Sequence, residues 1–314
     1  MDINTSPTVK KGWVSLQRTF LQLSILTIGL LLIGLCGSAS ARLIESTSPY
    51  LSGDTFRFMC DYHFDEVTTA FDPLEVKAGD CIFVKTDMLG AYFETKHPYI
   101  QFPYIIISHN ADHPAPGPGE AFLDDPKIVA WFAQNVEMTH PKLHPIPIGL
   151  ENPMFGKNVG LIAKHQKAIG TTPKTQVLYM NFTISNSPKE RQAAYNHFHD
   201  KPYCLYSSVK PWEQYLLDLL RTQFVVSPRG NGLDCLRTWE ALYMGAFPIV
   251  QTSHMDPLFE GLPVVIVNNW EEINASFLQR KYEKLTSTHY SLEKLYDPYW
   301  ENKIRFYKEI AKSR

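Results

Sequence analysis

One stretch of the chain decides its fold: Phe224-Val-Val-Ser-Pro-Arg-Gly-Asn-Gly-Leu-Asp-Cys-Leu-Arg-Thr-Trp-Glu-Ala-Leu-Tyr-Met-Gly-Ala-Phe-Pro-Ile-Val250. Its first four residues are apolar and rich in β-branched side chains, which is typical of a buried parallel strand. Asp234 is expected to cap a helix over 235–244, and Gly245 is expected to end that helix. The sequence therefore predicts a strand, a tight loop, a helix and a second strand.

The predicted loop has the composition of an anion site. Gly230 and Gly232 flank Asn231, so we expect the loop to adopt positive φ and to bring its backbone close to a ligand. Unpaired N–H groups and the positive end of the helix then point at one place, which favours an anion. Arg229 in the loop and Arg237 in the first helical turn are therefore predicted to bind a diphosphate through bidentate contacts.

Glu240 follows Arg237 by three residues, so the two side chains are neighbours on the helix surface. A carboxylate at this place is a candidate to accept hydrogen bonds from both hydroxyls of a ribose. The alternative is an ion pair between Arg237 and Glu240 on the helix surface, which would contribute little to stability.

The run Ser227-Pro-Arg-Gly-Asn-Gly-Leu-Asp-Cys-Leu-Arg-Thr-Trp-Glu-Ala-Leu242, followed by Gly245-Ala-Phe-Pro-Ile-Val250, resembles the donor-site signature of the exostosin-like glycosyltransferases. That signature joins an Arg–Gly loop, an Arg-x-x-Glu-Ala-Leu helix and a Gly-x-x-Pro-Val segment. The resemblance implies nucleotide-sugar binding, with Arg229, Arg237 and Glu240 holding the diphosphate and the ribose. It also implies a donor site without a metal, because the family usually does not need an Asp-x-Asp motif.

Composition is consistent with a folded protein of two domains. A chain of 314 residues is long enough for two ordinary domains, and 44% hydrophobic residues are enough for real cores. A formal charge of −2 gives no electrostatic reason to expect nucleic acid as a partner. The five cysteines show no zinc-like spacing; Cys60 and Cys81 either pair in an oxidising compartment or remain free thiols.

The N-terminus has the pattern of a membrane-targeting segment. An apolar run over 20–36 precedes Ala39-Ser-Ala41, which resembles a cleavage site of small residues. Basic residues before the run place the N-terminus in the cytoplasm, and the run is short but within range for a span. The sequence predicts a cytoplasmic tail over 1–19 and a signal anchor or signal peptide over 20–41.

Either segment sends the rest of the chain across a membrane. An anchor makes the protein a single-pass type II membrane protein. Its compartment would be a Golgi-like lumen if the source is eukaryotic, because nucleotide sugars are supplied there. A cleaved leader makes it a secreted or exported protein.

Residues 42–170 are predicted to form an N-terminal, acceptor-side domain. Asp80–Lys85 and Tyr104–Ser108 are expected to be strands, and a helical pattern begins at Asp124 and continues through Trp131. Alternating strands, loops and helices imply βαβ units and a parallel sheet.

The loop after the second of these strands holds the candidate catalytic residues. Ligands lie beyond the carboxyl ends of parallel strands, which places His109 and Asp112 near a cleft. A glycosyl transfer that inverts configuration needs a base to take the proton of the acceptor hydroxyl, and His or Asp suits that task. The alternative is that His109 and Asp112 only hydrogen-bond the loop backbone.

Residues 171–314 are predicted to form a C-terminal nucleotide-sugar donor domain that includes the C-terminal helices. A strand over 176–180 and a helix from Ser187 to about His199 form a second strand–loop–helix unit. Its loop faces the same cleft, so Asn181 and Arg191 are further donor-site candidates. Asn181 also begins a glycosylation sequon, and a glycan there would compete with a place in the cleft.

The resemblance and the patterns together predict an α/β protein with a GT-B-like fold: two Rossmann-like domains facing a cleft, preceded by a hydrophobic leader. The predicted function is transfer of a sugar from a nucleoside-diphosphate sugar to a hydroxyl of a glycan or glycoprotein acceptor, with no cofactor. Arg229, Arg237 and the loop N–H groups would stabilise the leaving diphosphate. The open alternatives are a catalytically inactive nucleotide-sugar or glycan-binding protein on the same fold, and a membrane-anchored scaffold.

Overall fold

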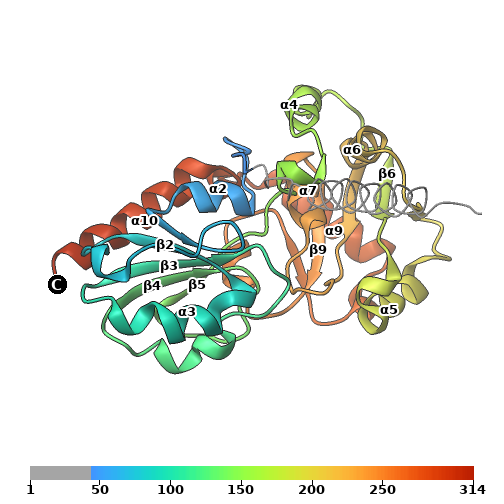
Figure 1. Ribbon diagram of the computed structural model, residues 1–314. Helices are drawn as coiled ribbons and strands as arrows, with labels where there is room; N and C mark the ends of the chain where they lie inside the picture. The colour runs from blue at the N-terminus through green and yellow to red at the C-terminus, as the bar shows by residue number, and fades with distance from the viewer. Residues whose placement is uncertain (1–43) are drawn as a thin grey trace, which may run out of the picture. The chain divides into compact units, whose positions relative to one another are not determined.

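The computed structural model describes residues 44–314, which form one compact unit. The predicted tail over 1–19 and the leader over 20–41 lie outside the described residues. Within the described part, no helix is both long and apolar enough to cross a membrane. The strands form two five-stranded sheets in which every neighbouring pair is parallel (Figure 1). The fold class is therefore α/β with two parallel sheets.

The first sheet runs in chain order, β1-β2-β3-β4-β5. Its central strands are continuous apolar runs because both faces of a parallel sheet are covered. All six residues of β4 are buried, from Ile128 to Ala133. The predicted helix through Trp131 is therefore wrong: this run of β-branched and aromatic residues has no polar side that a helix would expose. The strands are β1 (Tyr62–Phe64), β2 (Cys81–Lys85), β3 (Tyr104–His109), β4 (Ile128–Ala133) and β5 (Leu143–Pro145).

Helices cover both faces of the first sheet. Figure 1 shows α2 (Gly53–Phe58) and α10 (Asp297–Lys312) over one face and α3 (Leu89–Thr95) over the other. The C-terminal helix α10 packs against β3 and β4, with Trp300 and Ile304 buried. The sequence assigned this helix to the C-terminal domain. Its buried stripe instead covers the first sheet, because an amphipathic pattern shows that a face is buried but not which sheet buries it.

The second sheet has the order β10-β9-β8-β6-β7. Along β8 the side chains alternate between two hydrophobic clusters: Phe224 and Val226 belong to one and Val225 to the other. The strand is thus buried on both faces, as its apolar run predicts. The strands are β6 (Gln176–Met180), β7 (Cys204–Tyr206), β8 (Thr222–Val226), β9 (Phe247–Gln251) and β10 (Val265–Val267).

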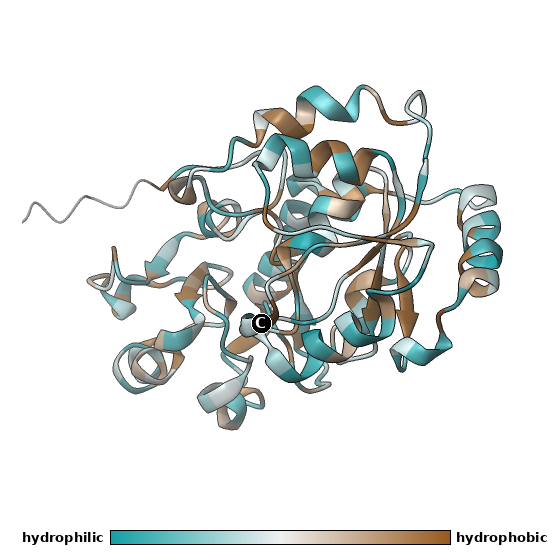
Figure 2. Ribbon diagram, turned by 90° about the vertical axis from the view of Figure 1, so that its right-hand side faces the viewer, coloured by the Kyte–Doolittle hydropathy of each residue, from teal (hydrophilic) through white to brown (hydrophobic). Residues whose placement is uncertain are grey.

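The remaining helices belong mainly to the second half of the chain. Side chains of α5 and α9 join one cluster and those of α6 and α7 join the other, so helices line both clusters of the second sheet. In Figure 2 the strands are largely hydrophobic, whereas several of the surrounding helices carry both hydrophobic and hydrophilic residues. These helices are α4 (Gly160–Gln166), α5 (Pro188–Phe198), α6 (Trp212–Leu220), α7 (Leu236–Tyr243), α8 (Asp256–Phe259) and α9 (Ala275–Ser287).

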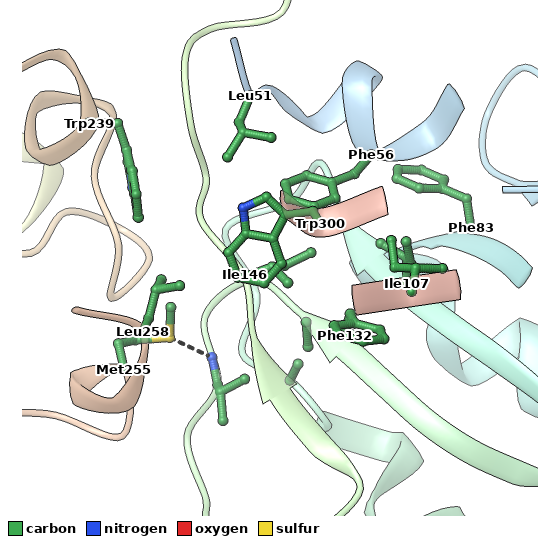
Figure 3. Packing of buried hydrophobic residues seen from close by; sticks show 14 of the residues in the cluster. Leu51, Phe56, Phe83, Ile107, Phe132, Ile146, Trp239, Met255, Leu258 and Trp300 are labelled. Atoms are coloured by element: carbon green, nitrogen blue, oxygen red, sulfur yellow. Dashed lines mark hydrogen bonds between the residues drawn. The ribbon is translucent and has the colours of Figure 1, made fainter. Parts of the chain in front are cut away.

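The larger hydrophobic cluster continues from the first sheet into the second half of the chain. Figure 3 shows Phe132 and Trp300 near the first sheet and Trp239 and Met255 from the second half. The backbone N–H of Val136 donates to the Met255 sulfur over 3.2 Å. The segments that follow β4 and β9 therefore share one interior, which places the loops at the strand ends close together.

Candidate functional site

The strand order of the second sheet reverses once. β6 lies between β7 and β8, so the chain moves to one edge after β6 and returns past it to form β8. In open parallel sheets, ligands bind beyond the carboxyl ends of the strands at such a reversal. The first sheet has no reversal. The topology therefore points to the segments that follow β6 and β8.

A cavity of about 410 Å³ lies at this place, and we call it the switch-point cavity. Its wall includes Asn181 and Phe182 after β6, Gly230 after β8, and Asp112 from the N-terminal half. The sequence-predicted residues that line it are Asp112, Asn181, Arg191, Gly230, Asn231, Arg237 and Glu240, whereas His109, Arg229 and Gly232 do not.

The two loop glycines are needed for close approach of protein side chains. Neither Gly230 nor Gly232 has positive φ, which corrects the prediction. A Cβ on Gly230 would lie 2.6 Å from Nη2 of Arg191, and one on Gly232 would lie 2.3 Å from Nδ2 of Asn135. The backbone therefore approaches Arg191 and Asn135, not only a ligand.

Arg191 comes from α5 and joins the two loops at the switch point. It is 5% exposed; its Nε donates to the Arg229 carbonyl over 3.0 Å and its Nη1 to the Thr183 carbonyl over 2.7 Å. Burial, with the charge of Arg237 second, lowers the pKa of Arg191. The side chain thus places a partly desolvated positive charge beside that of Arg237.

Arg237 lies in the first turn of α7, as predicted. Its Nε donates to the Asn181 carbonyl over 2.7 Å, and its guanidinium carbon is 5.3 Å from the centre of the Phe182 ring. Its Nη1 is buried and has no hydrogen-bond partner among the described residues. A buried unpaired donor costs about 1–3 kcal/mol, and more when it is charged. This atom therefore lacks an acceptor that a ligand with anionic oxygens would supply.

Arg229 does not share the cavity wall with Arg237. Among the residues that the structure describes, its guanidinium has only a long contact, Nη2 to the Asn231 carbonyl at 3.5 Å. Its carbonyl oxygen, in contrast, accepts the bond from Arg191. The cavity thus brings together Arg191 and Arg237, and neither forms an ion pair with a carboxylate of residues 44–314.

Glu240 is 4% exposed and is held by residues other than Arg237. Its Oε1 lies 3.2 Å from Nζ of Lys157, and its Oε2 accepts from the hydroxyl of Tyr215 over 3.0 Å. The alternative of a surface ion pair with Arg237 is therefore not formed. Sequence reasoning missed Lys157, Tyr215 and Trp212, which all line the cavity. Trp212 and Tyr215 had one signal, their spacing of three residues on a helix face.

His109 does not line the cavity. Its ring is 2% exposed, its Nε2 donates to the Pro147 carbonyl over 3.0 Å, and its Nδ1 accepts from the Asn110 N–H over 2.7 Å. A backbone N–H can only donate, so the proton of the neutral ring is on Nε2. Burial lowers the pKa of His109 to about 4. Both nitrogens are thus used within the fold, which matches the alternative reading of this residue.

Asp112 is exposed and lines the cavity from the N-terminal half. Its Oδ2 accepts from Nδ2 of Asn231 over 3.0 Å, and its carbonyl accepts from Nδ2 of Asn135 over 3.3 Å. An exposed carboxylate held in this way at the cavity wall is positioned to accept a proton from a bound hydroxyl.

Asn135 and Asp234 hold the two halves of the chain together at the cavity, whose wall includes Asp234. Asn135 has φ of 56° and accepts from the Asp234 N–H over 3.0 Å. The Asp234 carboxylate accepts from the N–H of Ile148 over 2.8 Å and from the indole of Trp239 over 2.7 Å. Asp234 is not the N-cap of α7, which corrects the predicted capping role: the N-cap residue is Cys235, whose N–H donates to Oδ1 of Asp234 over 2.8 Å. Burial raises the pKa of Asp234 to about 6.

In the described part of the chain, no three His, Cys, Asp or Glu side chains lie close enough together to hold a metal ion. The polar groups of the switch-point cavity are mainly cations and amides, which suit an anionic ligand.

No family model matches the sequence, and no curated protein matches it. Among solved structures, the chain is similar to the pneumococcal O-GlcNAc transferase GtfA, solved in complex with UDP and GlcNAc. The TM-score is 0.33 and the identity 11%, over 76% of this chain and 54% of that chain. The chain therefore spans about half the length of that protein. A likeness of this size concerns the fold alone, so the chemistry of the site has to come from its own geometry.

Proposed function

We propose that the protein is a glycosyltransferase that moves a sugar from a nucleoside-diphosphate sugar to a hydroxyl of a glycan or glycoprotein acceptor. One observation carries the proposal. Arg191 and Arg237 line the cavity at the strand reversal without a carboxylate partner in residues 44–314, and Nη1 of Arg237 is a buried donor without an acceptor. A diphosphate supplies anionic oxygens for the two guanidiniums, which have no carboxylate partner in residues 44–314, and an acceptor for Nη1 of Arg237.

In the proposed reaction the acceptor oxygen bonds to the anomeric carbon while the bond from that carbon to the diphosphate oxygen breaks. The diphosphate leaves with the electron pair, and the two guanidiniums stabilise its charge without reorganising. Asp112 takes the proton of the acceptor hydroxyl. In this proposal Arg191 takes the place that the sequence assigned to Arg229, and Asp112 acts without His109. No metal or other cofactor is part of the proposed donor site.

The proposal includes the sequence-based expectations for the N-terminus. Residues 20–41 would anchor the chain as a single-pass type II membrane protein, with the catalytic part in a Golgi-like lumen if the source is eukaryotic. If the leader is cleaved, the same catalytic part would be exported. The exostosin-like resemblance supports this family as the source of the donor signature.

A catalytically inactive nucleotide-sugar or glycan-binding protein remains the second candidate. The observation that favours it is that His109, one of the two candidate bases, is used within the fold, and the other, Asp112, already accepts from Asn231.

The test measures binding and transfer separately in the full chain. Nucleoside diphosphates are titrated by calorimetry, and transfer is measured from a panel of nucleoside-diphosphate sugars. Asp112→Asn should keep diphosphate binding and lose transfer by about 100-fold or more. Asp124→Asn, which changes a carboxylate that is 98% exposed, is the matched control and should keep both. Binding without transfer in the wild type would establish the inactive nucleotide-sugar-binding protein, and no diphosphate binding would refute both that protein and the transferase.

A further inference from the structure

The switch-point cavity has a corner between α6 and α7. Trp212 opens α6, Glu240 lies in α7, and both side chains line the cavity. Glu240 is three residues beyond Arg237, which is about 4.5 Å along the helix axis. A ligand with its diphosphate at Arg237 would therefore place its adjoining group, the nucleoside, in this corner.

A side chain of the protein itself fills the corner. Nζ of Lys157 lies 3.2 Å from Oε1 of Glu240 and 4.6 Å from the centre of the Trp212 ring. Lys157 comes from the segment between the two sheets, and the same ammonium lies 3.6 Å from Oε2 of Glu151. Its charge thus has two carboxylate partners, one in the corner and one outside the cavity wall.

The indole of Trp212 has the features of a stacking surface. One contact is a parallel stack on Tyr215, with ring centres 5.7 Å apart and planes 25° apart. Lys157 covers the ring as a cation, and the ring stays partly exposed. Its Nε1 is buried without a hydrogen-bond partner among the residues described. A flat base stacks on such a ring as favourably as an ammonium does, and more of its surface leaves water.

We propose that Trp212 is the stacking surface for the nucleobase of the donor and that Lys157 occupies this corner until a nucleotide displaces it. This inference rests on the proposed function. On binding, the base replaces the ammonium on the indole, and ligand hydroxyls replace it at Oε1 of Glu240. Lys157 keeps Glu151 as its partner, so the buried carboxylate is never left without a donor and the lysine is never left without an anion.

Displacement of Lys157 distinguishes nucleoside diphosphates from inorganic pyrophosphate. A nucleoside diphosphate has to displace Lys157, whereas inorganic pyrophosphate needs only the guanidiniums of Arg191 and Arg237. The ratio of nucleoside-diphosphate affinity to pyrophosphate affinity therefore measures binding in the corner between α6 and α7. The affinity for pyrophosphate alone measures binding at Arg191 and Arg237.

The experiment is a calorimetric titration of the full chain with uridine diphosphate, guanosine diphosphate and inorganic pyrophosphate. Trp212→Leu should lower the affinity for nucleoside diphosphates about tenfold and change the affinity for pyrophosphate by no more than about twofold. Trp212→Phe should recover most of the loss because it keeps an aromatic ring. Lys157→Met should raise the ratio of nucleoside-diphosphate to pyrophosphate affinity about fivefold. Lys167→Met, at an exposed lysine later in the same connecting segment, is the matched control and should leave the ratio unchanged.

The outcomes distinguish this inference from the function on which it rests. Wild-type protein that binds neither pyrophosphate nor nucleoside diphosphates refutes the proposed function. Binding of both, with the same ratio in Trp212→Leu as in the wild type, overturns the inference alone. If Lys157→Met lowers the affinities for pyrophosphate and for nucleoside diphosphates equally, Lys157 is a phosphate ligand, and this result also overturns the inference. If thermal melting shows that Trp212→Leu is unfolded, Trp212→Phe and Lys157→Met decide.

Discussion

Under the proposed function, Arg237→Ala should leave the protein folded and remove most of the proposed transferase activity. Two contacts stabilise the side chain in the folded protein: the 2.7 Å bond from Nε to the Asn181 carbonyl and the packing on Phe182 at 5.3 Å. A hydrogen bond from a charged group contributes about 1.5–3 kcal/mol, and a partly exposed cation–ring contact about 0.5–1 kcal/mol.

Two features of the same side chain oppose these contacts. Its Nη1 is buried without a partner among residues 44–314, which costs about 1–3 kcal/mol. Its charge also repels that of Arg191, whose pKa is lowered first by burial and second by the charge of Arg237. Removing the Arg237 side chain removes both the two stabilising contacts and the two destabilising features. We therefore expect the free energy of unfolding without ligand to change by about 1 kcal/mol or less.

The effect on catalysis should be larger, because no cost offsets the loss of the bond to the leaving diphosphate. Removing one preorganised donor raises the barrier by about 2–4 kcal/mol, which lowers kcat/KM about 30- to 1,000-fold. The assay is transfer from a panel of nucleoside-diphosphate sugars, with urea unfolding of the same preparations. Arg221→Ala, at an exposed arginine just before β8, should keep both activity and stability.

Either of two results would refute this reasoning. An Arg237→Ala variant with unchanged kcat/KM would show that the guanidinium does not act on the leaving group. A variant that loses several kcal/mol of stability together with its activity would show that the side chain is structural.

Three further predictions concern Gly232, Asp234 and the pair Cys60 and Cys81. Gly232→Ala should destabilise the protein by about 1–3 kcal/mol in urea unfolding, because the new Cβ would lie 2.3 Å from Asn135; full stability would contradict the close approach. Asp234 has its pKa raised by burial to about 6, above its unfolded value, so its contribution should make the free energy of unfolding fall by about 2 kcal/mol between pH 4 and 6. Unfolding curves of the wild type and Asp234→Asn that keep a constant difference over this range would disprove it. Mild oxidation with diamide should form a disulfide between Cys60 and Cys81, whose sulfurs are 2.9 Å apart. Two titratable thiols should be lost, and the free energy of unfolding should rise by about 3 kcal/mol. Cys60→Ser should lose the effect, and an oxidised wild type that keeps all its thiols would show that the pair stays reduced.

Several features of the site depend on local sequence, and these were predictable. An apolar β-branched run, a glycine loop, a helix and Gly245 specify β8, α7 and β9 through short-range sterics and hydrogen bonds, and Gly245 indeed has φ of 68°. The placement of Arg237 in the first turn of α7 follows from the same local pattern. The parallel sheets also follow, because alternating strands and helices leave few other arrangements.

The sequence by itself determined the strands, the loop and the helix around the switch point, because each depends on residues close together in the chain. Only the tertiary structure decided that Arg191 replaces Arg229 on the cavity wall, that Glu240 pairs with Lys157, and that α10 covers the first sheet. The physical reason is that a local pattern specifies the conformation of a segment and whether it has a buried face. Which distant side chains meet across that face depends on how all the segments pack at once.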